Sequence, residues 1–195
     1  MADESHAVED ILDRIEDTAR SEGEVSVNDL AEAMGDRGWG PFLFVPAIIE
    51  ISPLGGIPGL PTMLALIIAI FAAQIAVGRE HMWLPGFLGR RSVSSERMLK
   101  AVDKMRPVGR WMDRWFHGRL PALTSDWVTR AAAVVVLLLC LTVPPLELVP
   151  FASTASMAAI AAFGLAFIMR DGLLMALGFA LSLTTVGVGL WAWLG

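Results

Sequence analysis

The sequence feature that most constrains the fold is a proline- and glycine-rich interruption between two apolar runs. The first run extends from Gly40 to Ile51, the interruption reads Ser52-Pro-Leu-Gly-Gly-Ile-Pro-Gly-Leu-Pro-Thr62, and the second run ends at Gly78. No continuous helix crosses such a stretch, because proline lacks an amide donor and glycine loosens the backbone. As helices the two runs would be about 20 and 24 Å long, shorter than a hydrocarbon core of about 30 Å. We therefore predict two half-helices that meet inside a membrane, as a re-entrant hairpin or a broken span.

The composition supports a membrane location for the chain. Of its 195 residues, 55% are hydrophobic, and the mean hydropathy is positive, which is too apolar for a soluble domain of this size. Irregular backbone persists in hydrocarbon only where protein or water satisfies its polar groups, so the interruption should face the protein interior. A single cysteine, Cys140, excludes a disulfide within the chain, and the N-terminus does not read as a cleavable signal peptide.

Charge is distributed very unevenly along the chain. Residues 1–37 carry twelve acidic residues and three arginines, a net charge of −9, whereas residues 79–119 carry ten basic and four acidic residues, a net charge of +6. The positive-inside rule places the basic segment in the cytoplasm, and the acidic N-terminus on the same side, where it can dock on that segment. We expect a multi-pass protein of the bacterial inner membrane with its C-terminus outside. Nucleic-acid binding is not expected, because the whole chain is acidic.

Four segments follow from these patterns. Residues 1–37 form an acidic cytoplasmic helical segment, and residues 38–80 form the first broken membrane hairpin. Residues 81–126 form basic amphipathic helices at the membrane interface. Residues 127–195 form a second broken hairpin and a last transmembrane helix.

Local signals predict helices in the two polar segments. Apolar residues recur on one helical face over positions 7–20, and Ser26-Val-Asn-Asp29 resembles a capping box with Asp in place of Glu. In the basic segment a helix is expected after Ser94, and Pro107 is expected to interrupt it before a second amphipathic helix. The aromatic-rich face of that second helix either lies in the membrane interface or packs on transmembrane helices.

The second half of the chain repeats the pattern of the first. A run over 131–143 is interrupted by Pro144-Pro-Leu-Glu-Leu-Val-Pro150 and resumes over 154–169. About 22 apolar residues follow, long enough for a full crossing. Paired interruptions in two halves indicate a membrane binding site near the midplane. The predicted fold class is therefore all-α: a polytopic membrane protein with two repeated broken or re-entrant helix hairpins, amphipathic interfacial helices and a C-terminal transmembrane helix.

Polar residues beside the two interruptions are the candidate ligand-binding positions. Thr62 and Thr154 stand where a helix restarts, so each is expected to N-cap the new helix. The exposed amides there would attract an anion, or the threonines would merely satisfy buried helix starts. The complete candidate set is Glu50, Thr62, Arg79, Glu147, Thr154 and Arg170.

The two glutamates are the sharper signals in this set, because ionisable groups in apolar segments are costly. Glu50 and Glu147 would act as proton carriers or as counter-charges to Arg79 or Arg170. The alternative is a position at the level of the lipid headgroups, where a glutamate is tolerated. Arg79 and Arg170 end apolar helices, where contact with lipid phosphate is the more common role.

Enzymatic chemistry is not indicated by any motif. His81 and His117 lack the spacing of a metal site, and Gly55-Gly-Ile-Pro-Gly59 lacks both the lysine and the strand–helix context of a phosphate-binding loop. The sequence contains no nucleophile elbow. We expect a protein without catalytic residues, metal ion or cofactor.

Seven short motifs stand in a characteristic order along the chain. They are Gly40-Pro41, Pro58-Gly-Leu-Pro-Thr62, Gly78-Arg79, Trp83-Leu-Pro85, Leu120-Pro-Ala-Leu-Thr124, the Pro144 to Pro150 interruption and Arg170-Asp-Gly-Leu173. In this order the chain resembles the ExoD family of exopolysaccharide-synthesis proteins, over about residues 26–195, with residues 1–25 outside the resemblance. The resemblance implies an inner-membrane protein that supports production of bacterial surface polysaccharide. It implies no established reaction and no catalytic residues.

Three functions are compatible with these features. The first is a transporter-like factor in exopolysaccharide synthesis or export, which holds a polysaccharide or a lipid-linked sugar at the two interruptions. The second is a non-catalytic membrane scaffold that recruits polysaccharide-synthesis proteins. The third is a small ion or proton transporter whose effect on polysaccharide is indirect. Half-helices that do not span the bilayer need protein beside them, so we also expect a homodimer in which each protomer covers the interruptions of its partner.

Overall fold

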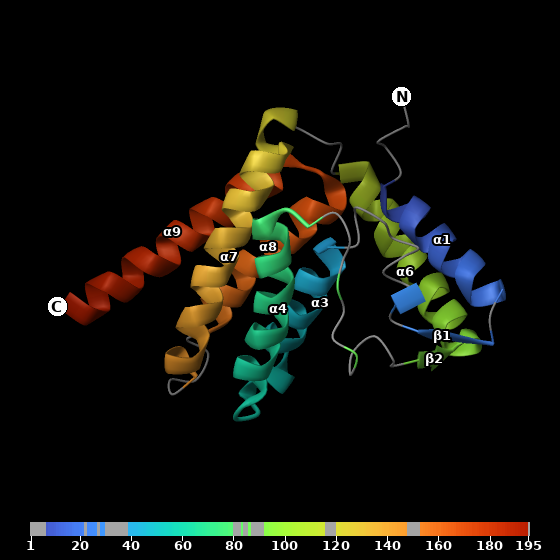
Figure 1. Ribbon diagram of the computed structural model, residues 1–195, viewed down its shortest axis with the longest axis horizontal. Helices are drawn as coiled ribbons and strands as arrows, with labels where there is room; N and C mark the ends of the chain where they lie inside the picture. Colours follow the sequence, from blue (N-terminus) through green and yellow to red (C-terminus); the bar gives the residue numbers. More distant parts are fainter. Residues whose placement is uncertain are drawn as a thin grey trace. The chain divides into compact units, whose positions relative to one another are not determined.

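A computed structural model gives the structure of the chain, which divides into two compact units (Figure 1). The first unit combines residues 1–38 with 80–119, and the second combines residues 39–79 with 120–195. The second unit is thus built from the two stretches that contain the interruptions. The structure describes residues 7–21, 23–26, 28–29, 39–79, 83, 86, 92–115, 120–147 and 153–194.

The first unit pairs an acidic helix with a basic one. Helix α1 (Ala7–Ser21) packs against helix α6 (Ser95–Trp115), and strands β1 (Glu24–Ser26) and β2 (Ser92–Ser94) form a short antiparallel ribbon. The apolar face predicted for the first helix is confirmed, because Ile11, Leu12 and Ala19 are buried. Val102 of α6 is buried as well. The acidic segment therefore docks on the basic segment, as the charge pattern predicts.

An arginine of α6 is held by two acids of α1. The guanidinium group of Arg106 forms ion pairs with Asp13 and with Glu16, and Glu16 also pairs with Arg20 on its own helix. Hydrogen bonds from Arg106 to Glu16 and then to Asp13 raise the pKa of Arg106 above its ordinary value. The same acids that give α1 its charge thus fix its contact with α6.

The capping box at Ser26 is confirmed by its geometry. The amide of Ser26 donates to Asp29 Oδ2 at 2.7 Å, and the amide of Asp29 donates to Ser26 Oγ at 3.2 Å. These are the reciprocal bonds of a capping box, with Asp serving where Glu is usual. The hydroxyl and the amide of Ser26 hold the pKa of Asp29 below its ordinary value.

Helix α6 does not break at Pro107, and that prediction is wrong. The helix is continuous from Ser95 to Trp115 with Pro107 inside it. A proline in a helix removes the amide that would donate to the carbonyl four residues earlier, here that of Asp103. Both residues are exposed, so water can take the place of the missing donor.

The second unit consists of helices joined by short turns. In chain order they are α3 (Trp39–Ile51), η3 (Pro53–Gly56), α4 (Leu60–Val77), η4 (Pro121–Thr124), α7 (Asp126–Leu146), α8 (Thr154–Met169) and α9 (Gly172–Leu194). Helix α3 packs against α8, and α4 packs against α7, so the two hairpins lie side by side. Helix α9 packs on α8 and then extends away from the other helices (Figure 1).

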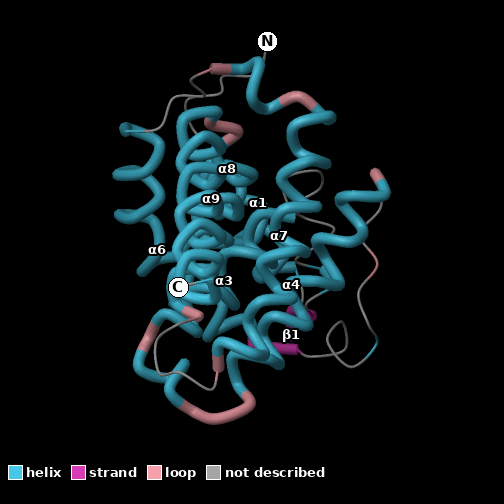
Figure 2. Tube along the Cα trace, turned by 90° about the vertical axis from the view of Figure 1, so that its left-hand side faces the viewer, coloured by secondary structure: helices cyan, strands magenta, loops and turns pink. Residues whose placement is uncertain are grey.

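The all-α prediction is confirmed for the described residues, where the β1–β2 ribbon is the only sheet (Figure 2). In the part of the chain that the structure describes, two helices, α4 and α7, are by length and composition able to cross a membrane. Helices α3 and α8 are equally apolar but shorter, with 13 and 16 residues. The sequence predicts a half-helix on both sides of each interruption. Only α3 and α8 are that short, whereas α4 and α7 reach 18 and 21 residues.

The second interruption starts later than the sequence predicts. Helix α7 continues through Pro144 and Pro145 to Leu146, although a break was expected from Pro144 onward. Both prolines lie in the last turn of the helix, where only the carbonyls of Cys140 and Leu141 lose a donor. The restart at Thr154 and the end of α8 at Met169 agree with the prediction.

Two glycines bring α3 and α8 into close contact. A Cβ added to Gly164 would lie 2.7 Å from the backbone nitrogen of Phe44, and one added to Gly40 would lie 2.7 Å from the carbonyl oxygen of Gly164. Any larger side chain at either position would push the helices apart. The close approach places the break ends of the two hairpins within reach of each other.

Candidate functional site

The helix ends that flank the two interruptions lie at the same end of the second unit, at the bottom of Figure 1. Helix α3 runs into the first interruption and α4 leaves it, while α7 runs into the second and α8 leaves it. Because α3 packs on α8 and α4 on α7, each incoming helix ends beside the outgoing helix of the other hairpin. The candidate site is formed by these four helix ends.

Glu147, at the end of α7, contacts the start of α4. Its carboxylate accepts a hydrogen bond from the backbone amide of Gly59 and another from the hydroxyl of Thr62. Gly59 is the N-cap of α4, so the carboxylate occupies the positive end of that helix. Two donors and the helix dipole stabilise the charged form of Glu147.

Glu50, near the end of α3, makes the corresponding contact with the start of α8. Its Oε1 accepts a hydrogen bond from the hydroxyl of Ser153, the N-cap residue of α8. Glu50 is only 3% exposed and Ser153 is buried as well. The second carboxylate oxygen, Oε2, is buried and has no hydrogen-bond partner among the described residues.

The two contacts are reciprocal. In each hairpin a glutamate at the end of the first helix reaches the start of the second helix of the other hairpin. Exchange of the two hairpins would exchange Glu50 with Glu147, and Ser153 with Gly59 and Thr62. This is the arrangement expected if the two hairpins are structural repeats, as the paired interruptions in the sequence suggest.

Glycines shape the first interruption so that it presents an amide to Glu147. Gly59 has φ of 85°, in the left-handed region that favours glycine. A Cβ on Gly55 would collide with the backbone carbonyl of Glu50, so the 3-10 turn Pro53–Gly56 folds tightly back on the end of α3. Ser52 caps that turn by accepting from the amide of Leu54 at 3.3 Å.

The predicted helix caps are one to three positions away from the real ones. Thr62 is inside the first turn of α4, whose N-cap is Gly59, and Thr154 is the first residue of α8, whose N-cap is Ser153. Proline is well tolerated in the first turn of a helix, so Pro61 lets α4 start before Thr62. Sequence reasoning found Thr62 but missed Gly59 and Ser153. The sequence does not distinguish Ser153 from Thr154 as the cap, because the two residues are adjacent and both types cap helices.

The two arginines of the candidate set lie away from the glutamates. Arg79 follows the end of α4, and Arg170 closes α8 with φ of 47°. Each is thus separated from the interruption by a whole helix, about 27 Å for α4 and about 24 Å for α8. Both side chains are exposed, and among the described residues neither forms an ion pair with Glu50 or Glu147.

A second polar contact links α7 to α8 inside the same hairpin. The hydroxyls of Thr142 and Ser156 lie 3.1 Å apart, and Ser156 is fully buried. Thr142 also donates to the carbonyl of Leu139 in its own helix at 2.7 Å. Hydroxyl groups therefore line the α7–α8 contact one turn beyond the glutamates.

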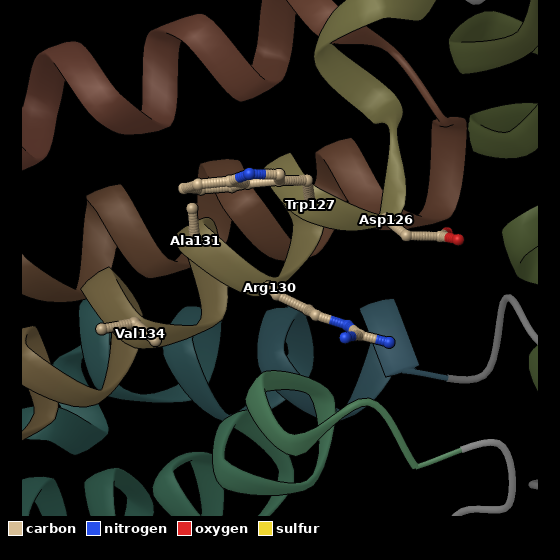
Figure 3. A pocket seen from close by; sticks show the side chains of 5 residues that line it. All are labelled: Asp126, Trp127, Arg130, Ala131 and Val134. Atoms are coloured by element: carbon tan, nitrogen blue, oxygen red, sulfur yellow. The ribbon is translucent and has the colours of Figure 1, made fainter.

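A groove of about 660 Å³ runs along the first turns of α7, at the opposite end from the interruptions. In Figure 3 the indole ring of Trp127 lies over Ala131, while Arg130 extends toward the other side of the helix. Trp127 is 74% exposed. The guanidinium of Arg130 rests on Gly78, where a Cβ would collide with it. Tryptophan and arginine at a helix end are typical anchors at a membrane–water interface.

Comparison with known proteins identifies the family. A family model described as "Exopolysaccharide synthesis, ExoD" matches residues 8–191. The chain belongs to the ExoD family. A curated relative, Protein ExoD of Rhizobium meliloti (strain 1021), is 28% identical over 168 residues, which cover 83% of this chain and 68% of the relative. No solved structure matches the chain.

The ExoD match extends further toward the N-terminus than the motifs indicate. The resemblance read from the sequence leaves residues 1–25 outside, whereas the family model begins at residue 8. Helix α1 therefore belongs to the ExoD homology, in agreement with its packing on α6. Membership of the ExoD family implicates the chain in exopolysaccharide synthesis.

Among the described residues of this ExoD chain, no group of three or more metal-ligating side chains comes together. His81 and His117, which the sequence analysis considered as metal ligands, lie outside the described residues. The polar groups described at the site are carboxylates, hydroxyls and backbone amides. Such groups bind other molecules through hydrogen bonds and charge.

Proposed function

We propose that the chain is a multi-pass protein of the bacterial inner membrane that supports exopolysaccharide synthesis or export through a non-enzymatic site at its two helix breaks. The observation that carries the proposal is the reciprocal contact of Glu50 and Glu147 with the opposite helix starts. Ionisable groups in apolar helices are retained for function more often than for stability. Family membership supplies the process in which the site would act.

The surface of the second unit supports insertion into a lipid bilayer. Large apolar side chains are exposed along its helices, where a water-soluble protein would carry polar ones. At about 27 and 32 Å, helices α4 and α7 match the hydrocarbon core. Exposed apolar residues include Val45, Ile48, Met63, Leu66, Leu138, Leu141, Leu177 and Leu183.

The proposed topology keeps both polar segments in the cytoplasm. Each hairpin enters the membrane from the cytoplasmic side, turns at its interruption and returns, so the basic residues of α6 stay inside. Arg79 and Arg170 then lie at the cytoplasmic ends of α4 and α8, where they contact lipid phosphate. The interruptions then lie at the far ends of α4 and α7, near the outer boundary of the hydrocarbon core, where the neighbouring hairpin shields their polar groups.

The proposed ligand is a polysaccharide precursor, such as a lipid-linked sugar that carries phosphate. The starts of α4 and α8 offer amide and hydroxyl donors that now serve Glu147 and Glu50. An anionic group would exchange with a carboxylate at one of these helix starts. Thr154, the first residue of α8, stands beside the exchange position at Ser153.

A homodimer forms part of the proposal. Helices α3 and α8 are about 20 and 24 Å long, too short to cross the bilayer alone. A second protomer would shield the interruptions from lipid on the side that the neighbouring hairpin leaves open. The expected result is a dimer of the purified protein in detergent by light scattering. A monodisperse monomer with an intact fold would rule out this part of the proposal.

The site is tested by conservative substitutions and secreted polysaccharide. Glu50→Gln, Glu147→Gln and Thr62→Val should each reduce output at matched protein levels. Matched controls make the same chemical changes elsewhere: Glu96→Gln on the exposed surface of α6, and Thr184→Val on α9, where the hydroxyl donates only to the carbonyl of Ala180. The controls should retain full output. Full output from all three site variants would refute the site.

A scaffold function is the second candidate, favoured by the docking of α1 on α6. The two helices bury a common apolar face and join through Arg106, and their exposed charged residues would contact polysaccharide-synthesis proteins. Under this alternative, deletion of residues 1–25 abolishes polysaccharide output while membrane insertion stays intact. A truncated chain with full output would exclude the scaffold.

A further inference from the structure

The two membrane hairpins contain acids but no basic side chain. Between residues 40 and 78 the only ionisable side chain is Glu50, and between residues 131 and 169 the only ones are Cys140 and Glu147. No lysine, arginine or histidine of either hairpin can therefore neutralise a carboxylate at the break end of the unit. The two charged residues of α7, Asp126 and Arg130, lie at its opposite end.

Glu50 and Glu147 differ in how well the protein satisfies them. Glu147 is half-buried and receives hydrogen bonds at both carboxylate oxygens, from Gly59 and from Thr62. Glu50 is almost completely buried and receives one, from Ser153 at Oε1. A buried carboxylate oxygen that accepts nothing is strongly unfavourable unless something neutralises it.

The elements around Glu50 offer no titratable partner. Helix α3 packs on α8 and α4, and the 3-10 turn η3 packs on its end. From residue 154 to 169, from 60 to 77 and from 53 to 56, none of these elements contains an ionisable side chain. The end of α3 itself carries the negative pole of the helix dipole, which attracts positive charge.

We propose that Glu50 Oε2 binds a small monovalent cation, either a proton or Na⁺, with Ser153 as the residue that positions the carboxyl group. Carboxylate and hydroxyl oxygens beside an interrupted membrane helix are suited to both cations. If a proton binds, Oε2 becomes the hydroxyl of a carboxylic acid, and Oε1 is the carbonyl that accepts from Ser153. If Na⁺ binds, the carboxylate stays charged and Oε2 is a direct ligand. The inference goes beyond the proposed function, because it holds whatever else binds at the helix breaks.

Infrared spectroscopy of the purified full-length chain in lipid vesicles tests the proposal. The wild type, Glu50→Gln and Glu147→Gln are compared in buffers with and without Na⁺, over a range of pH. A protonated-carboxyl band that Glu50→Gln removes and Glu147→Gln retains is the result expected for a proton. A Na⁺-dependent shift of the carboxylate bands, lost in Glu50→Gln alone, is the result expected for Na⁺. A signal that depends equally on Glu147, or the absence of both signals, would overturn the proposal.

Ser153→Ala tests the assignment in a second way, which applies even where Glu50→Gln fails to fold. Loss of the Ser153 hydroxyl removes the one hydrogen bond to Oε1, so the carboxyl band should move to higher frequency without disappearing. An unshifted band would assign it to another group. Because the spectra are recorded on purified protein, their outcome is separate from polysaccharide output: the cation site can fail while the proposed function stands, and the reverse.

Discussion

The two glutamates at the helix breaks differ in how their carboxylates are surrounded. Glu50 lies in the last turn of α3 and Glu147 directly follows α7, yet the first is buried with a single donor and the second is half-buried with two. Both were identifiable from sequence, since an acid in an apolar run is costly. Their donors Ser153 and Gly59 were not, because each lies in the other hairpin and only the packing of the helices brings it close.

A pH dependence is expected at the capping box in the first unit. The folded-state pKa of Asp29 lies below its unfolded value of about 3.9 because Ser26 donates to the carboxylate. Asp29 therefore contributes stability above pH 4, and the contribution is lost as the pH falls through the folded-state pKa. The hydrogen-exchange protection of residues 23–29, measured relative to the intrinsic exchange rate at each pH, should fall on acidification. In Asp29→Asn this fall should be absent, and an equal fall would contradict the assignment.

Helices are read more reliably from the sequence than the points where they stop. The ends of α3 at Ile51, α8 at Met169 and the restart at Thr154 agree with the patterns. Proline misled the reading of α6 and α7, because a helix whose other contacts are intact continues through one lost hydrogen bond. The helix propensity of a residue acts at one position, whereas packing against neighbouring elements stabilises the helix along its whole length.

Replacement of Pro107 should stabilise helix α6. Pro107→Ala restores the amide that donates to the carbonyl of Asp103 and removes the steric conflict of the ring, an effect of up to about 3 kcal/mol. The midpoint of chemical unfolding of the first unit should rise. Lys104→Ala, on the same exposed surface, is the control and should change stability by less than about 0.5 kcal/mol. A lower midpoint for Pro107→Ala would show that the proline fits a bend that the unit needs.

The contact between α3 and α8 should be sensitive to a single methyl group. Gly164→Ala places a Cβ 2.7 Å from the backbone nitrogen of Phe44, and we expect a loss of about 1–3 kcal/mol in thermal or chemical unfolding. Gly187→Ala in α9 is the matched control, because its Cβ would meet nothing within 4 Å. That change should stabilise by about 0.5–1 kcal/mol. Equal effects of the same sign would mean that α3 and α8 do not pack this closely.

At the scale of the molecule, each unit is assembled from two separate stretches of chain. The first unit joins residues 1–38 to 80–119, and the second joins 39–79 to 120–195. Composition and charge divide the chain into four segments, but they do not show which segments pack together. That information lies in pairs such as Arg106 with Glu16 and Glu147 with Thr62, whose members are far apart in sequence.

Truncation at the N-terminus should show where the first unit begins. The family match starts at residue 8, and the buried face of α1 starts at Ile11 and Leu12. Deletion of residues 1–6 should leave the protease resistance of α6 unchanged. Deletion of residues 1–21 should expose Val102 and make α6 a cleavage site. Equal resistance of both truncated chains would show that α6 is stable without α1.

The glutamate contacts between the hairpins have a consequence for the order in which the protein can mature. During synthesis the chain up to residue 79 emerges first, with the carboxylate of Glu50 and the start of α4 both lacking the groups that satisfy them. Those groups are made only after some seventy further residues have been translated, when Glu147 and Ser153 arrive. The ribosome thus delivers an unfinished folding intermediate, and the later hairpin completes the earlier one as it completes itself.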